Sequence, residues 1–232
     1  MVQEIDVNNL NFAIDINNFD PNNIQSEETC NFVFILDLSP SMNQNNAIGE
    51  LTNAYNAFIE EMKKSHYGDR ILVCNIGFSS QVDMLNPFQP INSIPTMNFK
   101  TLNGLTALYD AVKVGLENAI EYRKRLETTG ILCKTLLFVI TDGYDNESTT
   151  NPSEVKSIIN NILKDEKNMF TFTTMMFGIG EKSTFQKAQE DMGIQYLATI
   201  GNSAAEIRKM IAFISSSVSS TASGQGIQNM NF

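Results

Sequence analysis

Two apolar periodicities alternate along the chain between residues 30 and 214. Residues 32–36 and 136–140 are apolar at every position, as expected for strands that are covered on both faces of a sheet. Strands are predicted at 32–36, 71–78, 136–140, 170–177 and 196–200, with residues 81–85 as a hairpin partner or short edge strand beside 71–78. Most of the predicted strands are therefore separated by long stretches with a different pattern.

Those intervening stretches carry apolar residues at spacings of three and four, which predicts helices with one buried stripe. The expected helices are 48–62, 108–120, 152–162, 183–192 and 203–214. Two of them have clear start signals. Asn151 precedes Pro152, which suits a side-chain cap followed by proline in the first turn, and Ser203 with Glu206 forms a capping box.

Strands that alternate with helices predict an α/β fold with a doubly wound, mostly parallel sheet. We expect six strands, flanked by helices, with one short antiparallel edge strand. In such sheets the ligand crevice lies beyond the carboxyl ends of the strands. Functional residues are therefore expected directly after Leu36 and directly after Ile140.

The length of 232 residues suits one domain with two extensions. Residues 30–214 form the predicted domain. Residues 1–29 are an Asn-rich N-terminal extension, in which the alternation from Leu10 to Ile16 predicts one strand, packed on the body or added to a sheet edge. Residues 215–232 are rich in Ser and Gly, which predicts a flexible tail.

Composition narrows the range of partners and locations. The formal net charge is −10, from 26 acidic and 16 basic residues, which disfavours nucleic acid and anionic membranes as partners. No apolar run reaches the roughly 18 residues that a membrane span needs, and the N-terminus lacks a signal-peptide pattern. The three cysteines lie in or beside apolar runs without C-x-x-C spacing, so buried reduced thiols and a cytoplasmic location are expected. No feature of the sequence indicates an oligomeric state.

Candidate chemistry lies at the two predicted strand ends. Asp37, Ser39 and Ser41 follow the first strand in the spacing D-x-S-x-S, and Asp142 follows the strand at 136–140. Thr106 lies in a loop that ends at the second helix. Carboxylate and hydroxyl oxygens form a hard environment that suits Mg²⁺ or Mn²⁺. A lone D-x-S-x-S also fits an ordinary turn, and only the three elements together favour a metal site.

These residues resemble the metal-ion-dependent adhesion site (MIDAS) of the von Willebrand factor A (vWA) family. That site combines a D-x-S-x-S loop, a distant Thr and an Asp at the end of a later strand, and Asp37, Ser39, Ser41, Thr106 and Asp142 match it in order. The resemblance covers roughly residues 30–214. Leu105 departs from the pattern, since many members carry a second Gly there. The resemblance implies that the three hydroxyls bind the cation directly or through water, and that the two carboxylates bind it directly or orient those waters.

The resemblance also implies a function without catalysis. The cation would keep an open position that a Glu or Asp carboxylate of a partner protein fills. The absence of a secretion signal and of a disulfide framework makes the chain most similar to intracellular bacterial or phage proteins of the type associated with tellurium resistance. We therefore expect a metal-dependent protein-protein interaction module and not an enzyme.

Two alternative functions stay open at this point. The first is a metal-dependent phosphohydrolase, although an aspartyl-nucleophile enzyme would carry a second Asp where Ser39 stands. The second is a structural or assembly protein of a larger particle, in which the metal site is incidental and the two extensions make the contacts. A phosphate-binding loop at Gly178–Ser183 is disfavoured, because Glu181 precedes Lys182 where that motif requires Gly.

Overall fold

The computed structural model describes residues 28–180 and 182–224. Its strands are β1 (Glu28–Asp37), β2 (Ile71–Phe78), β3 (Val82–Pro90), β4 (Leu132–Thr141), β5 (Phe172–Ile179) and β6 (Tyr196–Ile200). Its α-helices are α1 (Ala47–Lys63), α2 (Leu108–Thr128), α3 (Pro152–Leu163), α4 (Glu166–Thr171), α5 (Lys182–Met192) and α6 (Ala204–Ala222). Three 3-10 helices, η3 (Pro40–Asn46), η4 (Gly68–Arg70) and η5 (Ile91–Ser93), lie in the connections.

The strands form one six-stranded sheet in the order β3-β2-β1-β4-β5-β6. Every neighbouring pair is parallel except β2 with β3, which are antiparallel. The prediction of a doubly wound, mostly parallel sheet with one antiparallel edge strand is confirmed. Pro87 and Pro90 lie in β3, where proline is tolerated because an edge strand has one side without a ladder.

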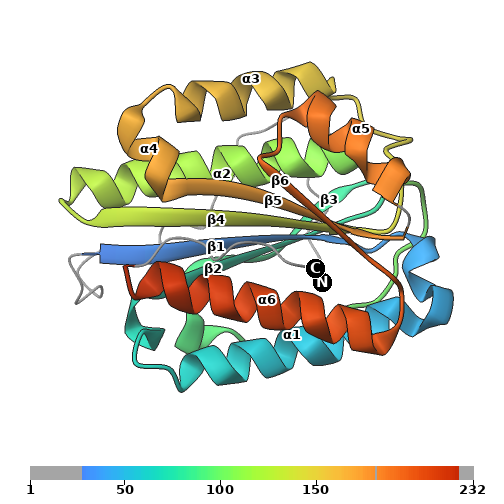
Figure 1. The fold of residues 1–232 in the computed structure, drawn as a ribbon, viewed down its shortest axis with the longest axis horizontal. Helices are drawn as coiled ribbons and strands as arrows, with labels where there is room; N and C mark the ends of the chain where they lie inside the picture. Colours follow the sequence, from blue (N-terminus) through green and yellow to red (C-terminus); the bar gives the residue numbers. More distant parts are fainter. Residues whose placement is uncertain (1–27, 181, 225–232) are drawn as a thin grey trace.

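Helices cover both faces of this sheet (Figure 1). Helices α1 and α6 pack on one face, and α2, α3 and α5 lie on the other. The apolar positions of β1 alternate between the two cores: Phe32 and Phe34 pack on the α1 side, whereas Val33 and Ile35 pack on the α2 side. This alternation explains why the strand is apolar at every position, since neither of its faces meets water.

The three cysteines, Cys30, Cys74 and Cys133, are buried free thiols, as the sequence predicted. Burial raises the pKa of the Cys30 thiol to about 12, so this thiol stays protonated and unreactive at neutral pH. Among the described helices, none combines the length and the apolar character that crossing a membrane requires.

The predicted domain boundary after residue 214 is wrong, because α6 continues to Ala222. Val218 and Ala222 extend the apolar stripe of Ile211 and Ile214, each at a spacing of four, and both are buried against the α1 side of the sheet. The serines interspersed in this part of α6 gave residues 215–222 a composition typical of a flexible tail. Their small side chains allow close packing instead, and Ser217 is completely buried. The rest of the predicted tail, 225–232, lies outside the described residues.

The N-terminal side differs less from expectation. β1 begins at Glu28, two residues before the predicted boundary at 30. The strand predicted between Leu10 and Ile16 lies outside the described residues. Helix α4 was not predicted. Asp165 caps α4 by accepting a hydrogen bond from the Lys167 amide. Because α4 extends to Thr171, β5 begins only at Phe172.

Candidate metal centre

The predicted site residues come from two central, adjacent and parallel strands. β1 and β4 pair in a register that places Leu36 opposite Ile140. Asp37 therefore ends β1 beside the end of β4, and Asp142 follows β4 directly. Both strands end on the same side of the molecule (Figure 1), so their two carboxylates emerge at one edge of the sheet.

The D-x-S-x-S segment turns its three polar side chains towards one point. The Ser39 amide donates to Asp37 Oδ1 at 2.8 Å, which closes the turn after β1. The Ser39 and Ser41 hydroxyl oxygens lie 3.0 Å apart, and Ser41 Oγ donates to Asp142 Oδ1 at 2.7 Å. The chain then enters η3 with Pro40 at its first position. Four of the five predicted residues are thus joined by hydrogen bonds.

Thr106, the fifth residue, approaches from the loop before α2. It is buried, and its Oγ1 would lie 3.8 Å from a Cβ placed on Gly143, the residue after Asp142. Asn146 fixes this approach: the Thr106 amide donates to Asn146 Oδ1 at 2.7 Å, and the Asn146 amide donates to the Thr106 carbonyl at 3.0 Å. The structure therefore brings Thr106 next to the Asp142 loop.

The same loop caps α2, which has no side-chain cap from its own N-cap residue, Ala107. Asp145 Oδ1 accepts from the Tyr109 amide at 3.3 Å, and Ser148 Oγ accepts from the Asp110 amide at 3.1 Å. The buried Asp110 carboxylate in turn accepts from the amides of Thr149 and Thr150. Asp145 and Asn146 thus support the loop and the helix.

Thr141 is a site residue that the sequence reasoning missed. Its hydroxyl donates to Asp37 Oδ2 at 2.6 Å, and together with the Ser39 amide it holds both carboxylate oxygens of Asp37. The predicted pairing of the two apolar strands already contained the signal, because parallel strands that end together place Thr141 beside Asp37. The sequence prediction ended this strand at Ile140 and assigned only Asp142 of the following residues to the site, whereas β4 extends to Thr141.

The loop that carries Thr106 is also anchored from the other side. Gly104 has a φ of +127°, and a Cβ there would lie 2.5 Å from Ser80 Oγ, so only glycine fits. The same Ser80 hydroxyl accepts from the Leu105 amide at 2.7 Å. Leu105 itself is 48 % exposed, so the residue that departs from the family pattern displaces no oxygen from the site.

Both carboxylates are held where a negative charge is unfavourable. Asp37 is fully buried, and burial raises its pKa, which the hydrogen bonds from Ser39 and Thr141 offset only in part. Burial raises the pKa of Asp142 to about 6, and the nearby Asp37 charge adds to the shift. Neither carboxylate takes part in any of the ion pairs found within residues 28–180 and 182–224.

This donor set fits a hard divalent cation. Asp37, Ser39, Ser41, Thr106 and Asp142 offer carboxylate and hydroxyl oxygens, the ligands that Mg²⁺ and Mn²⁺ prefer. Within the described part of the chain, no group of three or more His, Cys, Asp or Glu residues converges, so no site built mainly from imidazole, thiolate or several carboxylates competes with it. A cation bound here would neutralise two carboxylates that have no counter-ion among residues 28–180 and 182–224.

Comparisons with known proteins identify the fold. No sequence-family profile and no curated protein sequence matches the chain. Among solved structures, proximal thread matrix protein 1 from the mussel byssus matches with a TM-score of 0.53 and 15% identity, over 81% of this chain and 45% of that chain, in a form described as having a zinc-occupied MIDAS motif. The pilus adhesin SpaC from Lactobacillus rhamnosus GG matches with a TM-score of 0.60 and 14% identity, over 84% of this chain and 30% of that chain.

A third structure, the conserved hypothetical protein BatB from Bacteroides thetaiotaomicron, matches with a TM-score of 0.50 and 13% identity, over 84% of this chain and 100% of that chain. The chain thus spans less than half the length of the mussel and Lactobacillus proteins. These neighbours are vWA-type proteins, and at such low identity the likeness concerns the fold alone. The chain therefore has a vWA-like α/β fold.

Proposed function

We propose that this chain is a metal-dependent protein-binding module. Its candidate metal centre holds one divalent cation, Mg²⁺ or Mn²⁺, through Asp37, Ser39, Ser41, Thr106 and Asp142, and the bound cation grips a Glu or Asp carboxylate of a partner protein. We also propose that the module is not an enzyme, that it works in the cytoplasm, and that it belongs with the intracellular proteins of the tellurium-resistance-associated type.

One observation carries the proposal. Asp37 and Asp142 bring two negative charges to one strand edge, hydroxyl groups surround them, and no described Lys or Arg pairs with either. Buried like charges without a counter-ion destabilise a fold unless a cation or a proton neutralises them. The MIDAS motif named for the mussel protein supports a cation as that neutralising group.

The chain's own residues have separate roles in this proposal. Thr141 and the Ser39 amide fix Asp37, so its carboxylate cannot swing away when the charge around it changes. Asn146 fixes Thr106, and the Ser39 and Ser41 hydroxyls present neutral oxygens. Because three of the five assigned residues offer neutral hydroxyls, a bound divalent cation would keep enough positive charge to attract one further carboxylate.

Two observations support the setting and the absence of catalysis. The three thiols are buried and unpaired with one another, which suits a reducing compartment. The side chain two residues after Asp37 is a hydroxyl that bonds to Ser41, and it cannot act as the general acid of an aspartyl-phosphate enzyme.

Titration calorimetry with Mg²⁺ and Mn²⁺ tests the metal site. We expect one site per chain in the wild type and no measurable binding in the double variant Ser39→Ala, Ser41→Ala. Ser216→Ala is the matched control, because this exposed serine bonds only to a carbonyl of its own helix. Unchanged binding in the double variant would refute the assigned site.

Capture of partners from the native host tests the grip on a carboxylate. Proteins retained by the wild type with Mg²⁺, and released by EDTA, should not be retained by the double variant. Partner contacts that persist in EDTA and in the double variant would favour the assembly role instead. Metal-dependent hydrolysis of p-nitrophenyl phosphate that the double variant abolishes would favour a phosphohydrolase.

A further inference from the structure

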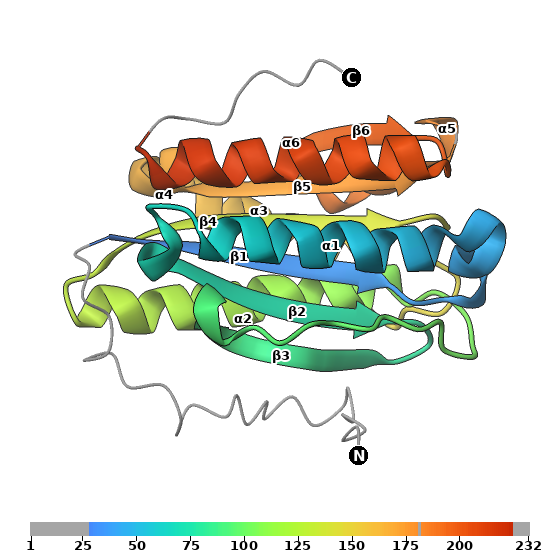
Figure 2. The same ribbon diagram turned by 90° about the horizontal axis from the view of Figure 1, so that it is seen from below.

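A groove of about 730 Å³ lies beside the candidate metal centre, between β3 and the segment 97–103. In Figure 2 the green segment after β3 runs back along β2 and β3 towards the ends of the parallel strands. The volume falls within the range of cavities that hold small ligands or a few side chains. We call this feature the β3 groove.

The floor of the β3 groove is apolar. Leu38 and Leu85 meet over Gly77, where an added Cβ would lie 2.5 Å from Leu38 Cδ1 and 3.1 Å from Leu85 Cδ1. Phe99 and Met97 complete the apolar lining from the facing segment. The absence of a side chain at position 77 therefore lets the two leucines cover the carboxyl end of β2 and form the floor.

The outer wall of the groove is fixed to the body of the protein. The Met97 amide and carbonyl both bond to the Asn56 side chain, each at 2.8 Å. Further along, Thr101 Oγ1 accepts from Asn43 Nδ2 at 2.7 Å, and the Leu102 amide donates to the Leu38 carbonyl at 2.7 Å. A wall held at several points is preformed, so an occupant would lose little affinity to ordering it.

The β3 groove is continuous with the candidate metal centre. Leu38, part of its floor, lies between Asp37 and Ser39 in the chain, and Leu102 on its wall belongs to the loop that leads to Thr106. Leu102 is 38 % exposed, and Leu105 and Tyr144, from the loops that carry Thr106 and Asp142, are also exposed. The oxygen-rich centre thus has apolar side chains around it, the arrangement of a protein-binding hot spot.

Charge decides which side chain the groove accepts. Asp83 lines it from β3, and Lys100 lines it from the facing segment. The two opposite charges leave the groove without a net charge. A second carboxylate would meet Asp83, which shares one face of β3 with Leu85, whereas an apolar side chain buries the leucine floor and adds no like charge.

We propose that the β3 groove takes an apolar side chain of the same partner segment whose carboxylate binds the cation, an inference that rests on the proposed function. The partner carries a Glu or Asp and, within about four residues of it, a Leu, Met or Phe, since an extended chain advances about 3.3 Å per residue and the groove begins one residue from Ser39. The acid supplies the metal contact, and the apolar residue supplies specificity.

A displayed peptide library tests this partner class. The library has seven random residues on each side of a fixed Glu, and a matched library has Gln in its place. We select both on the wild type in Mg²⁺ and in EDTA. The expected winners come only from the Glu library in Mg²⁺ and share an apolar residue at one preferred offset from the Glu.

The best peptide is then measured against variants of the protein. Leu85→Thr and Leu102→Ser should each weaken its binding about fivefold to tenfold, because each removes about 1 kcal/mol of apolar contact, while Mg²⁺ affinity stays unchanged. Leu132→Ser, at the other end of the sheet and 54 % exposed, is the control and should bind as the wild type does. Changing the apolar peptide residue to Ala should give a similar loss on the unaltered protein, whatever the folding of the variants.

The outcomes separate the two proposals. If the Glu library shows no Mg²⁺-dependent enrichment, the proposed function fails and this inference fails with it. If acidic peptides are enriched without an apolar preference, or if that preference survives in both groove variants, the groove assignment alone is overturned and the metal-dependent grip stands.

Discussion

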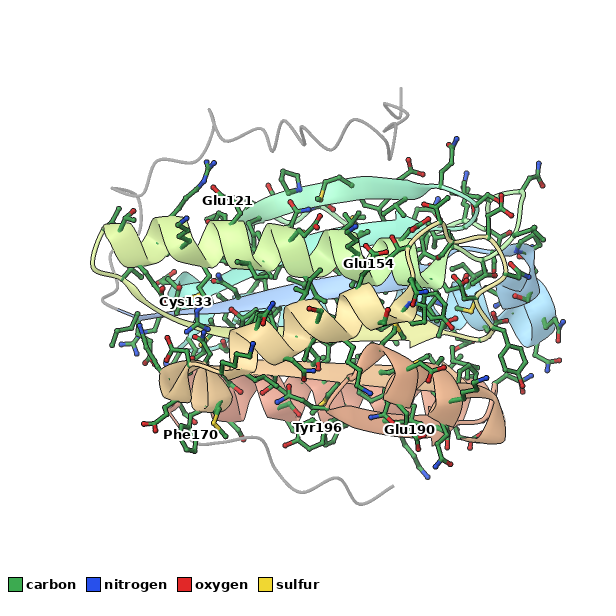
Figure 3. The ribbon with its side chains drawn as sticks, turned by 90° about the horizontal axis from the view of Figure 1, so that it is seen from above. Glu121, Cys133, Glu154, Phe170, Glu190 and Tyr196 are labelled. Carbon is green, nitrogen blue, oxygen red and sulfur yellow. The ribbon has the colours of Figure 1, made fainter. Side chains whose placement is uncertain are left out.

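Both ends of the sheet expose large apolar side chains, but they differ in whether their buried charges have ion-pair partners. At the end where the parallel strands finish, Leu102, Leu105 and Tyr144 are exposed around the candidate metal centre. At the other end, Leu132, Met169 and Phe170 are exposed. Figure 3 shows Phe170 on α4, at the end of the molecule opposite the site loops.

The charges at the Phe170 end are paired with one another. Arg123 lies 3.2 Å from Glu127, which also accepts from Lys167 at 3.1 Å, and Lys134 lies 2.6 Å from Glu28. At the metal-centre end, the donors that Asp37 and Asp142 find among the described residues are hydroxyls and amides. Exposed apolar surface therefore does not distinguish the two ends, whereas unneutralised buried charge does.

The direction of the strands explains the asymmetry. Where parallel strands finish, α1, α2 and α6 begin, and their N-terminal amides partly stabilise negative charge. Where the strands begin, these helices end, and their carbonyls favour cations such as Arg125 and Lys63 in the last turns of α2 and α1. The helix ends thus favour carboxylates where the strands finish and cations where the strands begin.

The largest expected effect is at the paired end. Arg123→Ala removes a buried guanidinium that donates to the Thr171 carbonyl at 3.1 Å and to Thr171 Oγ1 at 2.7 Å. We expect a loss of about 2–4 kcal/mol in the free energy of unfolding, because the partly buried Thr171 acceptors lose their partner and the buried Arg123 side chain no longer fills its place. Urea denaturation measures it. Mg²⁺ affinity should not change, and a change would show that the two ends are coupled.

The next largest effect is expected at the metal-centre end. Asp142→Asn keeps an oxygen for the Ser41 hydroxyl but removes one negative charge from the centre. We expect Mg²⁺ affinity to fall about tenfold to hundredfold, as for the loss of a charged group close to a metal. Titration calorimetry measures it, with Glu127→Gln at the other end as the control. Equal losses in the two variants would mean that overall charge, and not this site, attracts the cation.

The third prediction tests whether a proton or a metal ion neutralises the charge of Asp142. Burial raises the pKa of folded Asp142 to about 6 from an ordinary 3.8, so without metal the folded state gains stability by binding a proton. That stability is complete below about pH 3.8 and is lost as the pH rises through 6. In EDTA, the free energy of unfolding of Asp142→Asn should therefore rise relative to that of the wild type by about 1 kcal/mol between pH 4.5 and 7.5, a figure reduced for solvent screening of a partly buried carboxyl.

Chemical denaturation at several pH values, in EDTA, checks this sign. Glu147→Gln, an exposed acid on the same loop, is the control and should show no comparable change. A wild type that becomes more stable than Asp142→Asn as the pH rises would contradict the assigned environment of Asp142. Saturating Mg²⁺ should reverse the order at pH 7.5, because only the wild type then neutralises the charge with tightly bound metal.

The comparison also shows what the sequence can predict. The strands and the stripes of α1 and α2 follow from periodicity alone, because burial on one or two faces leaves a direct pattern. The tail after Ile214 was misjudged because Ser217 and Ser220 are polar by composition but small enough to be buried in α6. α4 was missed because its six residues are too few to show a helical period.

The sequence predicted the candidate ligands of the site but not the contacts that position them. The D-x-S-x-S spacing and the strand ends indicated Asp37 and Asp142 directly. The contacts that position these residues, from Thr141 and Asn146, depend on which loops face each other, and only the strand register and the capping of α2 reveal that. Candidate oxygen ligands can be recognised from a sequence, whereas the groups that hold them in place can be identified only from the fold.

The smallest expected effect tests one of those positioning residues. Asn146→Ala removes the acceptor of the Thr106 amide, and the Thr106 hydroxyl then loses part of its fixed approach to the Asp142 loop. We expect Mg²⁺ affinity to fall about fivefold, less than for Asp142→Asn, because the Asn146 amide still bonds to the Thr106 carbonyl and no charge is lost. Asn146→Asp, which keeps the acceptor oxygen, should restore the affinity.

Asn168→Ala is the control at the other end, since its side chain likewise bonds to one backbone group, the Ile162 carbonyl at 3.0 Å. If both alanine variants lower the unfolding stability alike but only Asn146→Ala lowers metal affinity, Thr106 needs its anchor in order to act as a ligand. If neither changes the affinity, the Thr106 loop reaches the cation by packing alone, and the two ends of the sheet differ in charge but not in how firmly they hold their loops.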